Sequence, residues 1–260
     1  GFTLPPLPIR AFAIQADPPQ HTIERDLFKE VLNVDMYRRF EAHAAHDAAR
    51  LIDAFAPGGE VDLVAALCEP LPVLTICGMI GLDAEEATRV RPVAIATFEA
   101  TKDVGLMIEA NRKFNALVKE FSDTRRAQPR EDFMTRLATQ PFEGAMMSDD
   151  EIGNLLQGIL IAGHHTTTSA MASLLAHIFG DPQVKRKLID DPDLVRAAVE
   201  ETLRLNTPLH MFGRTTRCPV IVRGAALPQD AFVMLNWASA NRDAETFENP
   251  DEFRLDRAPN

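Results

Sequence analysis

The chain has 260 residues, of which 46% are hydrophobic and 25% are charged, and 27 basic against 38 acidic side chains give a formal net charge of −11. This composition is typical of a folded protein with a buried core, and the acidic balance argues against nucleic-acid binding, which needs clustered Lys and Arg. Three cysteines, Cys68, Cys77 and Cys218, are too few for a disulfide framework and lack zinc-site spacing, so we expect a reducing compartment, the cytoplasm. The most apolar stretch, residues 71–82, is too short to span a membrane.

Two helices are predicted at the start of the chain. Asp17 supplies a carboxylate that suits a helix cap, and the two prolines that follow it suit a first helical turn. Apolar residues at helical spacing then continue to about residue 33. A second helix is expected over residues 36–56, where the turn sequence Pro57-Gly58-Gly59 ends it.

Prolines interrupt the apolar segment that follows. Pro70 and Pro72 make one continuous helix over residues 61–82 improbable, because a proline inside a helix removes a backbone hydrogen bond. We therefore predict a short extended piece over residues 61–63 and a buried helix over residues 72–80.

The middle of the chain carries the strongest helical signals. Asp83 caps a further helix, and an amphipathic stretch over residues 106–126 predicts a long one. Ser148 and Glu151 then have the spacing of a capping box, in which each side chain bonds the other residue's backbone amide. No proline follows until after Phe179, so we predict a helix of about 32 residues, or roughly 48 Å, whose middle lies in the core.

The C-terminal part changes from helix to strand. Asp181 and Asp191 each precede a proline and mark helix starts, and Pro208 ends the second of these helices after Leu205. We predict a mainly α fold with a small β portion in a single domain over residues 1–260. The predicted strands are residues 215–216, 220–222 and 232–235.

The long helix contains a segment of unusual composition. Residues 162–168 combine Gly163 with three threonines and two histidines, which are poor helix formers. Gly lets a flat ligand approach the backbone, and a threonine hydroxyl can bond a carbonyl one turn earlier, open the helix locally and hold a water. The alternative is a crossing of helices through small residues, with His164 and His165 at the surface.

Two more elements become informative only in combination. Glu201 and Arg204 share a helix face at i, i+3. Residues 241–243 and 247–257 form an arginine-bearing irregular meander with two aromatic anchors. Alone, the pair is common and the meander is only a loop.

The order and spacing of these elements resemble the cytochrome P450 superfamily of haem-thiolate monooxygenases, in its soluble bacterial branch. The matching features are Ala162-Gly163 with Thr166-Thr167, the Glu201 to Arg204 pair, a strand region, and the meander. Residues 17–22 with Arg25 also match the start of that family's C helix. The resemblance implies a cytochrome P450 fold truncated at both ends, with the N-terminal sheet region and the C-terminal cysteine loop absent.

The resemblance also implies binding roles. His21, Arg25 and Arg214 correspond to donors to the haem propionates. Glu201 and Arg204 correspond to a buried pair that an arginine of the meander completes. The usual position of that arginine is Glu252 here, so the resemblance leaves Arg257 or Arg242 for the role, and we predict Arg257.

Ala162, Gly163 and Thr166 correspond to the catalytic bend of the family's I helix, where the threonine hydroxyl helps deliver protons to bound dioxygen. His165 stands where the family has Asp or Glu, so we expect a different or weaker proton relay. The family's metal-ligating cysteine lies in a loop downstream of the meander, and Cys68, Cys77 and Cys218 lie elsewhere. The resemblance therefore gives no metal ligand in this chain.

The function implied is insertion of one atom of O2 into a small apolar organic substrate. Haem b is the implied cofactor, with NAD(P)H as the indirect electron source through a ferredoxin-type or flavodoxin-type donor, and the 260 residues alone are expected to be inactive. One alternative is an inactive P450-like scaffold that binds a small ligand or a partner. A weaker one is a helical metalloprotein that uses His164, His165 or the His43 and His46 pair, although neighbouring helical residues point about 100° apart.

Overall fold

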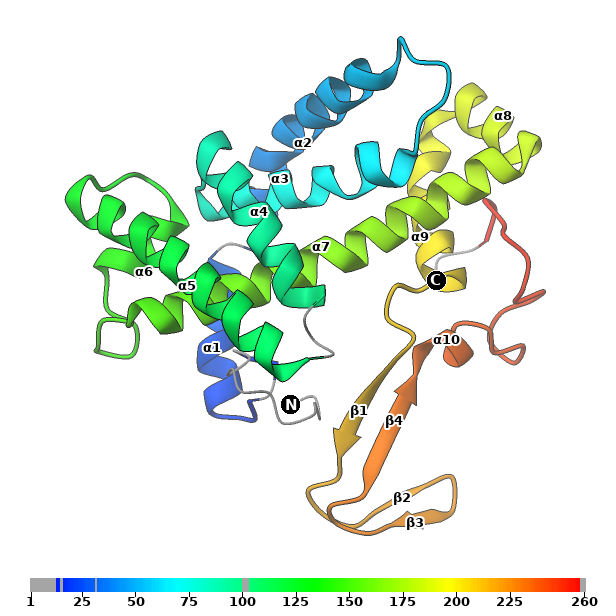
Figure 1. Cartoon of the computed structure of the whole chain (residues 1–260). Coiled ribbons are helices and arrows are strands. Elements are labelled where there is room, and N and C mark those ends of the chain that lie inside the picture. The colour runs from blue at the N-terminus through cyan, green and yellow to red at the C-terminus, as the bar shows by residue number, and fades with distance from the viewer. Residues whose placement is uncertain (1–12, 15, 31, 100–102, 258–260) are drawn as a thin grey trace. The chain divides into compact units, whose positions relative to one another are not determined.

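A computed structural model describes residues 13–14, 16–30, 32–99 and 103–257 (Figure 1). These residues form two compact units whose boundary falls between His164 and His165, inside one long helix. The single domain over residues 1–260 stays a prediction. The fold is mainly helical with two small antiparallel sheets, which confirms the predicted fold class.

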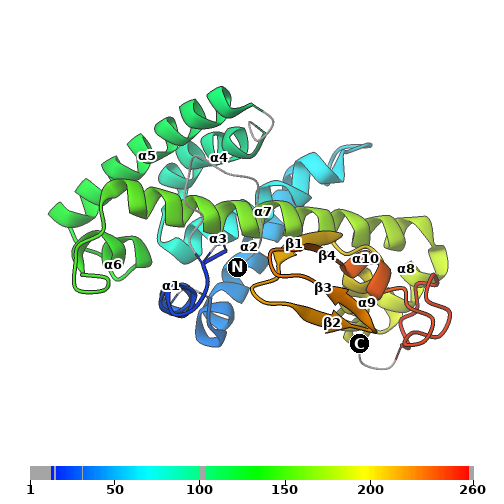
Figure 2. The ribbon, with the colours of Figure 1, turned by 90° about the horizontal axis from the view of Figure 1, so that it is seen from below.

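Seven helices build the described part of the first unit. The predicted helix over residues 36–56 and the long helices in the middle of the chain are present, with ends that differ by a few residues. Figure 2 shows the long α7 together with α4 and α5 from below. The helices are α1 (Gln20–Lys29), α2 (Val34–Phe55), α3 (Pro70–Ile80), α4 (Ala84–Glu99), α5 (Val104–Ala127), α6 (Phe133–Thr139) and α7 (Asp149–Gly180), of which α7 continues into the second unit.

Capping side chains set several of these boundaries. Asp83 Oδ1 accepts from the backbone amide of Glu86 at 3.0 Å, and the Glu86 carboxylate accepts from the backbone amide of Asp83 at 2.9 Å. The predicted capping box of α7 is also present, because Ser148 and Glu151 each accept from the other's backbone amide at 3.3 and 2.9 Å. Local sequence therefore determines where these two helices begin.

Three predictions near the start of the chain were wrong. Helix α1 begins at Gln20, without a side-chain cap, because the two prolines after Asp17 form a turn. Helix α3 begins at Pro70, since both its prolines lie in the first turn, where backbone N–H groups have no helical acceptor. Residues 61–63 form no strand, because the Asp62 carboxylate instead caps a π-helical turn, η1 (Val64–Cys68).

The core of the first unit lies between α3, α5, α6 and α7. Each helix contributes fully buried apolar side chains, and burying one such side chain is worth about 1.5–3 kcal/mol. Cys68 and Cys77 are also fully buried, which confirms that they are packing residues. Representative core residues are Ile80, Phe114, Val118, Met134, Leu137, Ile152 and Leu155.

The second unit places helices before a pair of small sheets. Strands β1 and β4 pair with Met211 opposite Asn236, and β2 and β3 pair with Val220 opposite Leu227. Strand β3 was not predicted, because its Ala-Ala-Leu sequence has little strand preference. The elements after α7 are α8 (Pro182–Asp190), the 3-10 turn η3 (Pro192–Leu194), α9 (Val195–Leu205), β1 (Met211–Thr215), β2 (Val220–Val222), β3 (Ala225–Leu227), β4 (Phe232–Asn236) and α10 (Trp237–Ala240).

Among the described residues, no helix is both long enough and apolar enough to cross a lipid bilayer. Residues 71–82, the most apolar stretch of the sequence, form most of α3 and pack in the first unit.

A buried ion cluster ties α5 to its neighbours. The guanidinium of Arg125 has no exposed surface and donates to both carboxylate oxygens of Glu86, at 2.7 and 2.8 Å. It also donates to Asp132 at 2.9 Å and to the Gly81 carbonyl at 2.7 Å. These bonds hold its pKa above the ordinary value for arginine, with the Glu86 hydrogen bonds as the largest cause. Arg125 therefore stays charged and joins three segments of the unit.

Replacing Arg125 should destabilise the first unit. We expect Arg125→Met to lower the free energy of unfolding by about 3–5 kcal/mol, because two buried carboxylates lose their partner. Arg112→Met on the same helix is the matched control, since Arg112 pairs with Glu109 in solvent, where such pairs contribute about 1 kcal/mol or less. Urea unfolding measures both, and equal losses in the two variants would contradict the account.

Candidate active site

The predicted site residues divide between the two units. His21, Arg25, Ala162 and Gly163 belong to the first unit, and His165, Thr166 and Arg214 belong to the second. The second unit also brings together the three residues predicted to form a buried cluster, which are Glu201, Arg204 and Arg257.

Glu201 is the centre of this cluster. Its carboxylate, 1% exposed, accepts from Arg204 Nε and Nη2 at 2.7 and 2.8 Å, a bidentate arrangement within one helix. Arg257 Nε approaches the same carboxylate at 2.9 Å, and the backbone amide of Arg254 donates to it at 3.1 Å. Two guanidinium groups and one amide therefore satisfy one buried carboxylate.

The remaining donors of the two arginines bind the meander backbone. Arg204 donates to the carbonyls of Asn241, Pro250 and Glu252, at 2.8, 2.7 and 3.1 Å. Arg257 donates in the same way, and its acceptors are the carbonyls of Glu248, Asn249 and Glu252, at 2.7, 3.2 and 3.2 Å. An irregular segment has few regular hydrogen bonds of its own, so these side chains supply the donors that its carbonyls need.

Aromatic contacts add to these hydrogen bonds. The guanidinium of Arg204 lies 5.2 Å from the centre of the Phe247 ring, a cation–π distance. The Phe253 ring stacks on His177 with ring centres 4.1 Å apart, and His177 Nε2 donates to Asn206 Oδ1 at 2.7 Å. The two phenylalanines of the meander therefore anchor it to α9 and to the end of α7. Their roles were predicted only as anchors, without partners.

The charge state of Glu201 follows from two opposed effects. Burial raises the pKa of a carboxyl group, but the hydrogen bonds from Arg204, Arg257 and the Arg254 amide outweigh it and hold the pKa of Glu201 below its ordinary value. Glu201 is therefore ionised at neutral pH.

The geometry also decides between the two arginines left open by the sequence. Arg257 binds Glu201, whereas Arg242 pairs with Asp251 at 2.5 Å and donates to the Leu205 carbonyl at 2.9 Å. Glu252 takes part through its backbone carbonyl, which both cluster arginines reach. No contact predicted from the sequence required this carbonyl, so its role was missed.

The unusual segment, residues 162–168, lies within α7 and is helical over its whole length. Ile76 of α3 fills the space beside Gly163, where a Cβ atom would lie 2.0 Å from the Ile76 Cδ1 atom. The glycine therefore permits a close helix contact within the first unit. His164 is 6% exposed, which corrects the alternative that both histidines lie at the surface, while His165 is half-buried and Ala162 is exposed.

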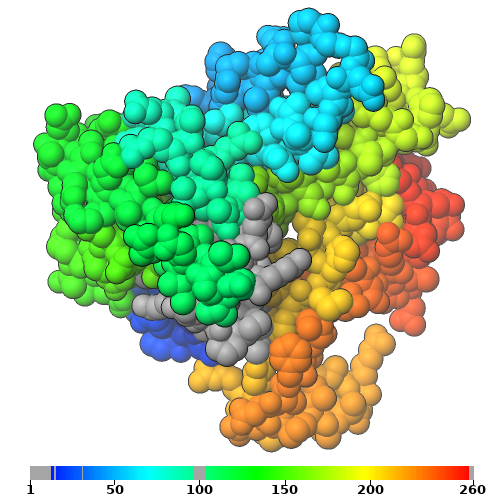
Figure 3. All heavy atoms as spheres, viewed as in Figure 1, coloured from blue at the N-terminus to red at the C-terminus, as the bar shows by residue number. Residues whose placement is uncertain are grey.

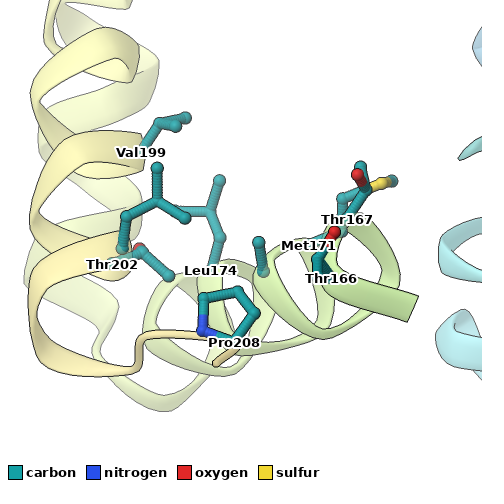
Figure 4. A pocket seen from close by; sticks show the side chains of 9 residues that line it. Thr166, Thr167, Met171, Leu174, Val199, Thr202 and Pro208 are labelled. Atoms are coloured by element: carbon teal, nitrogen blue, oxygen red, sulfur yellow. The ribbon is translucent and has the colours of Figure 1, made fainter. Parts of the chain in front are cut away.

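Thr166 lies on a pocket of the second unit. The pocket has a volume of about 330 Å³ and lies between α7 and α9, and Figure 4 shows the side chains that line it. Thr202 of α9 also lines the pocket, which was not predicted, and its hydroxyl donates to the Ala198 carbonyl at 2.7 Å. The other lining residues are Thr167, Ala170, Met171, Leu174, Val199, Leu203 and Pro208.

Three basic side chains predicted to bind an anion have different surroundings. His21 and Arg25 lie one turn apart on α1, and within the described part of the chain neither side chain makes a hydrogen bond or an ion pair. Arg214 lies on β1, opposite Val233, and its Nη1 donates to the Gly213 carbonyl at 3.0 Å. His21 and Arg25 thus retain donors for an anionic ligand.

The described residues offer no metal site that would support the metalloprotein alternative. In the ranges that the structure describes, no three His, Cys, Asp or Glu side chains lie close enough to hold a metal ion, and this includes His43 and His46. Burial raises the pKa of Cys77 to about 12 and also raises the pKa of Cys68, so both stay protonated thiols. Cys218 is exposed.

The sequence profile of the family described as cytochrome P450 matches residues 99–257. Cyclomarin C epoxidase CymV of Salinispora arenicola is 31% identical over 93% of this chain and 63% of its own length. Mycinamicin IV hydroxylase/epoxidase of Micromonospora griseorubida is 30% identical over 97% of this chain and 64% of its own. The crystal structure of CYP109E1 from Bacillus megaterium with testosterone superposes with a TM-score of 0.86 at 27% identity, over 96% of this chain and 69% of that one. The chain thus spans somewhat under two thirds of the two curated relatives.

Removing Arg204 should destabilise the second unit strongly. Because Arg204→Ala leaves the Glu201 carboxylate without its bidentate partner, we expect the free energy of unfolding to fall by about 3–5 kcal/mol. Arg186→Ala is the matched control, since Arg186 pairs with Asp190 on a largely exposed helix face. Chemical unfolding followed by circular dichroism measures both. A loss below about 0.5 kcal/mol for Arg204→Ala, the range of ordinary surface changes, would contradict the role of the cluster.

Proposed function

Because the chain belongs to the cytochrome P450 family, we propose that its full-length protein is a haem-dependent monooxygenase acting on a small apolar organic molecule. The observation that carries the proposal is the cluster of Glu201, Arg204 and Arg257. In this cluster the Glu201 and Arg204 pair of α9 is hydrogen-bonded directly to Arg257 of the meander, so two elements of the family pattern meet. The relatives named as an epoxidase and a hydroxylase/epoxidase support an oxygen-inserting reaction. Because these two relatives are named for different substrates, we propose only the class of substrate for this protein.

Haem b is the proposed cofactor. His21, Arg25 and Arg214 would hold its propionates, and the free donors of His21 and Arg25 fit groups of that charge. When bound, haem supplies an iron at which dioxygen is activated by electrons. The cluster around Glu201 acts as a positioning element, because its arginines bind the backbone carbonyls of the meander.

Proton handling is assigned to α7. Thr166 has a hydroxyl at Oγ1 that can hold a water by donating or accepting a hydrogen bond, and it lies on the pocket between α7 and α9. His165, the residue before it, supplies an imidazole in place of a carboxylate. A free imidazole titrates near pH 6.5, and only its protonated form can donate a proton to a neighbouring water, so an imidazole at this position makes proton delivery dependent on pH.

Electron supply requires a partner. We assign NAD(P)H as the indirect source, through a ferredoxin-type or flavodoxin-type donor, because the 260 residues resemble neither a flavin domain nor an iron–sulfur domain. The three free cysteines support a reducing compartment, for which we propose the cytoplasm. The 260 residues alone are proposed to be inactive, since Cys68 and Cys77 are buried thiols and none of the three cysteines lies in the loop context of the family's ligand.

The proposal is tested by isotope incorporation in the full-length protein. With NAD(P)H, a ferredoxin-type donor and a panel of small apolar compounds that includes testosterone, we expect a product containing one atom from ¹⁸O₂. The yield of this product per NAD(P)H consumed should fall as the pH rises through about 6.5. Failure to bind haem, together with unlabelled compounds throughout, would contradict the proposed function.

His165→Ala separates the proton relay from the reaction class. We expect this variant to lose coupling and to show a flat pH profile, because the titrating imidazole is gone. His43→Ala, a change of an exposed histidine on α2, is the matched control and should behave as the wild type. Coupling and pH dependence unchanged in His165→Ala would make His165 a bystander while leaving the oxygen-inserting function intact.

A further inference from the structure

A second pocket lies in the first unit, between α3 and α4. Its volume is about 360 Å³, near the lower end of the range of ligand pockets, which is about 300–1,000 Å³. In Figure 3 both helices, cyan and blue-green, lie at the surface of the face shown. The walls are mainly apolar, and the lining residues are Leu74, Ala87, Thr88, Arg91, Pro92 and Ile95.

Arg91 is the unusual member of this lining. It is half-buried, yet it makes no hydrogen bond or ion pair within the described residues. The other described arginines without a hydrogen bond or ion pair, such as Arg25 and Arg196, are exposed to solvent. A guanidinium that is partly removed from water and has no partner is unfavourable, so this position calls for an anion.

Two nearby carboxylates are already engaged. Arg89, two residues earlier, takes both oxygens of Glu120 at 2.7 and 2.6 Å. Glu86 lies one turn before the pocket and is bound by Arg125. Neutralisation of Arg91 by either acid would therefore require breaking an existing pair.

We propose that this pocket binds a small amphipathic carboxylate, with its carboxylate on Arg91 and its hydrocarbon chain between α3 and α4. Leu74, Pro92 and Ile95 supply the apolar wall, and Thr88, whose hydroxyl donates to the Ala84 carbonyl at 2.8 Å, borders the pocket one turn before Arg91. The site is independent of haem and of the proposed monooxygenase reaction.

The overall charge of the chain makes Arg91 the main source of attraction for an anionic ligand in this pocket. Because the chain carries a net charge of −11, its long-range field repels anions, and attraction must come from the local guanidinium. Hydrophobic burial alone would favour a neutral alcohol of the same length at least as strongly. The contribution of the guanidinium to affinity can therefore be separated from that of hydrophobic burial with ligands that differ only in the head group.

The experiment is calorimetric titration of the 260-residue chain with sodium octanoate, 1-octanol and inorganic phosphate. We expect octanoate to bind at least tenfold more tightly than either of the others, and Arg91→Met to weaken octanoate binding at least tenfold. Arg91→Lys should retain part of the affinity, and Arg112→Met, an exposed change on α5, should retain all of it. Equal binding of octanoate and octanol, or of octanoate and phosphate, would overturn the proposal.

Location is tested separately by hydrogen exchange. Octanoate should slow exchange of the backbone amides in α3 and α4, and protection confined to other helices would place the ligand elsewhere and overturn the proposal. Thr88→Phe gives a second variant that keeps Arg91 but narrows the pocket from an exposed position. It should also weaken octanoate binding, and wild-type affinity in both Thr88→Phe and Arg91→Met would overturn the assignment.

Discussion

The ionised carboxylate of Glu201 is the constraint on which the second unit depends. A buried charge is strongly unfavourable unless every lone pair finds a donor, and here two guanidinium groups and one amide meet that demand. The same two arginines then bind carbonyls along the meander. One buried acid on α9 thereby organises an irregular segment about fifty residues further along the chain, which has little regular secondary structure to hold it.

The first unit uses the same device in a different place. Arg125 joins Glu86, Asp132 and a backbone carbonyl where three segments meet, and its side chain is fully buried. Most ion pairs of the chain lie instead in solvent and contribute little to stability. In both clusters arginine is needed, because its planar fork binds a carboxylate with two donors and still has donors left for carbonyls. Lysine cannot replace it in that geometry.

The parts of the fold that were predictable are those determined by local sequence. The cap at Asp83, the capping box at Ser148 and the uninterrupted length of α7 all depend on residues a few positions apart. Helix α3 begins two residues before the predicted start, because Pro70 and Pro72 both fit its first turn. Sequence reasoning favoured Arg257 but left Arg242 open beside it, because the choice depends on a contact across 56 residues. The family pattern predicted which residues belong to the cluster, and the structure adds the hydrogen bonds that each of them makes.

The most direct test of this account is the pH dependence of unfolding in wild type and Glu201→Gln. The folded-state pKa of Glu201 lies below its unfolded value, so its ionisation stabilises the fold fully above about pH 4.5 and ceases to do so as the pH falls through the folded pKa. We predict that wild type exceeds Glu201→Gln in free energy of unfolding by the largest margin near pH 7, and that this margin shrinks steadily below about pH 4.5. A difference that stays constant from pH 7 to pH 3 would contradict the claim that an ionised Glu201 holds the cluster together.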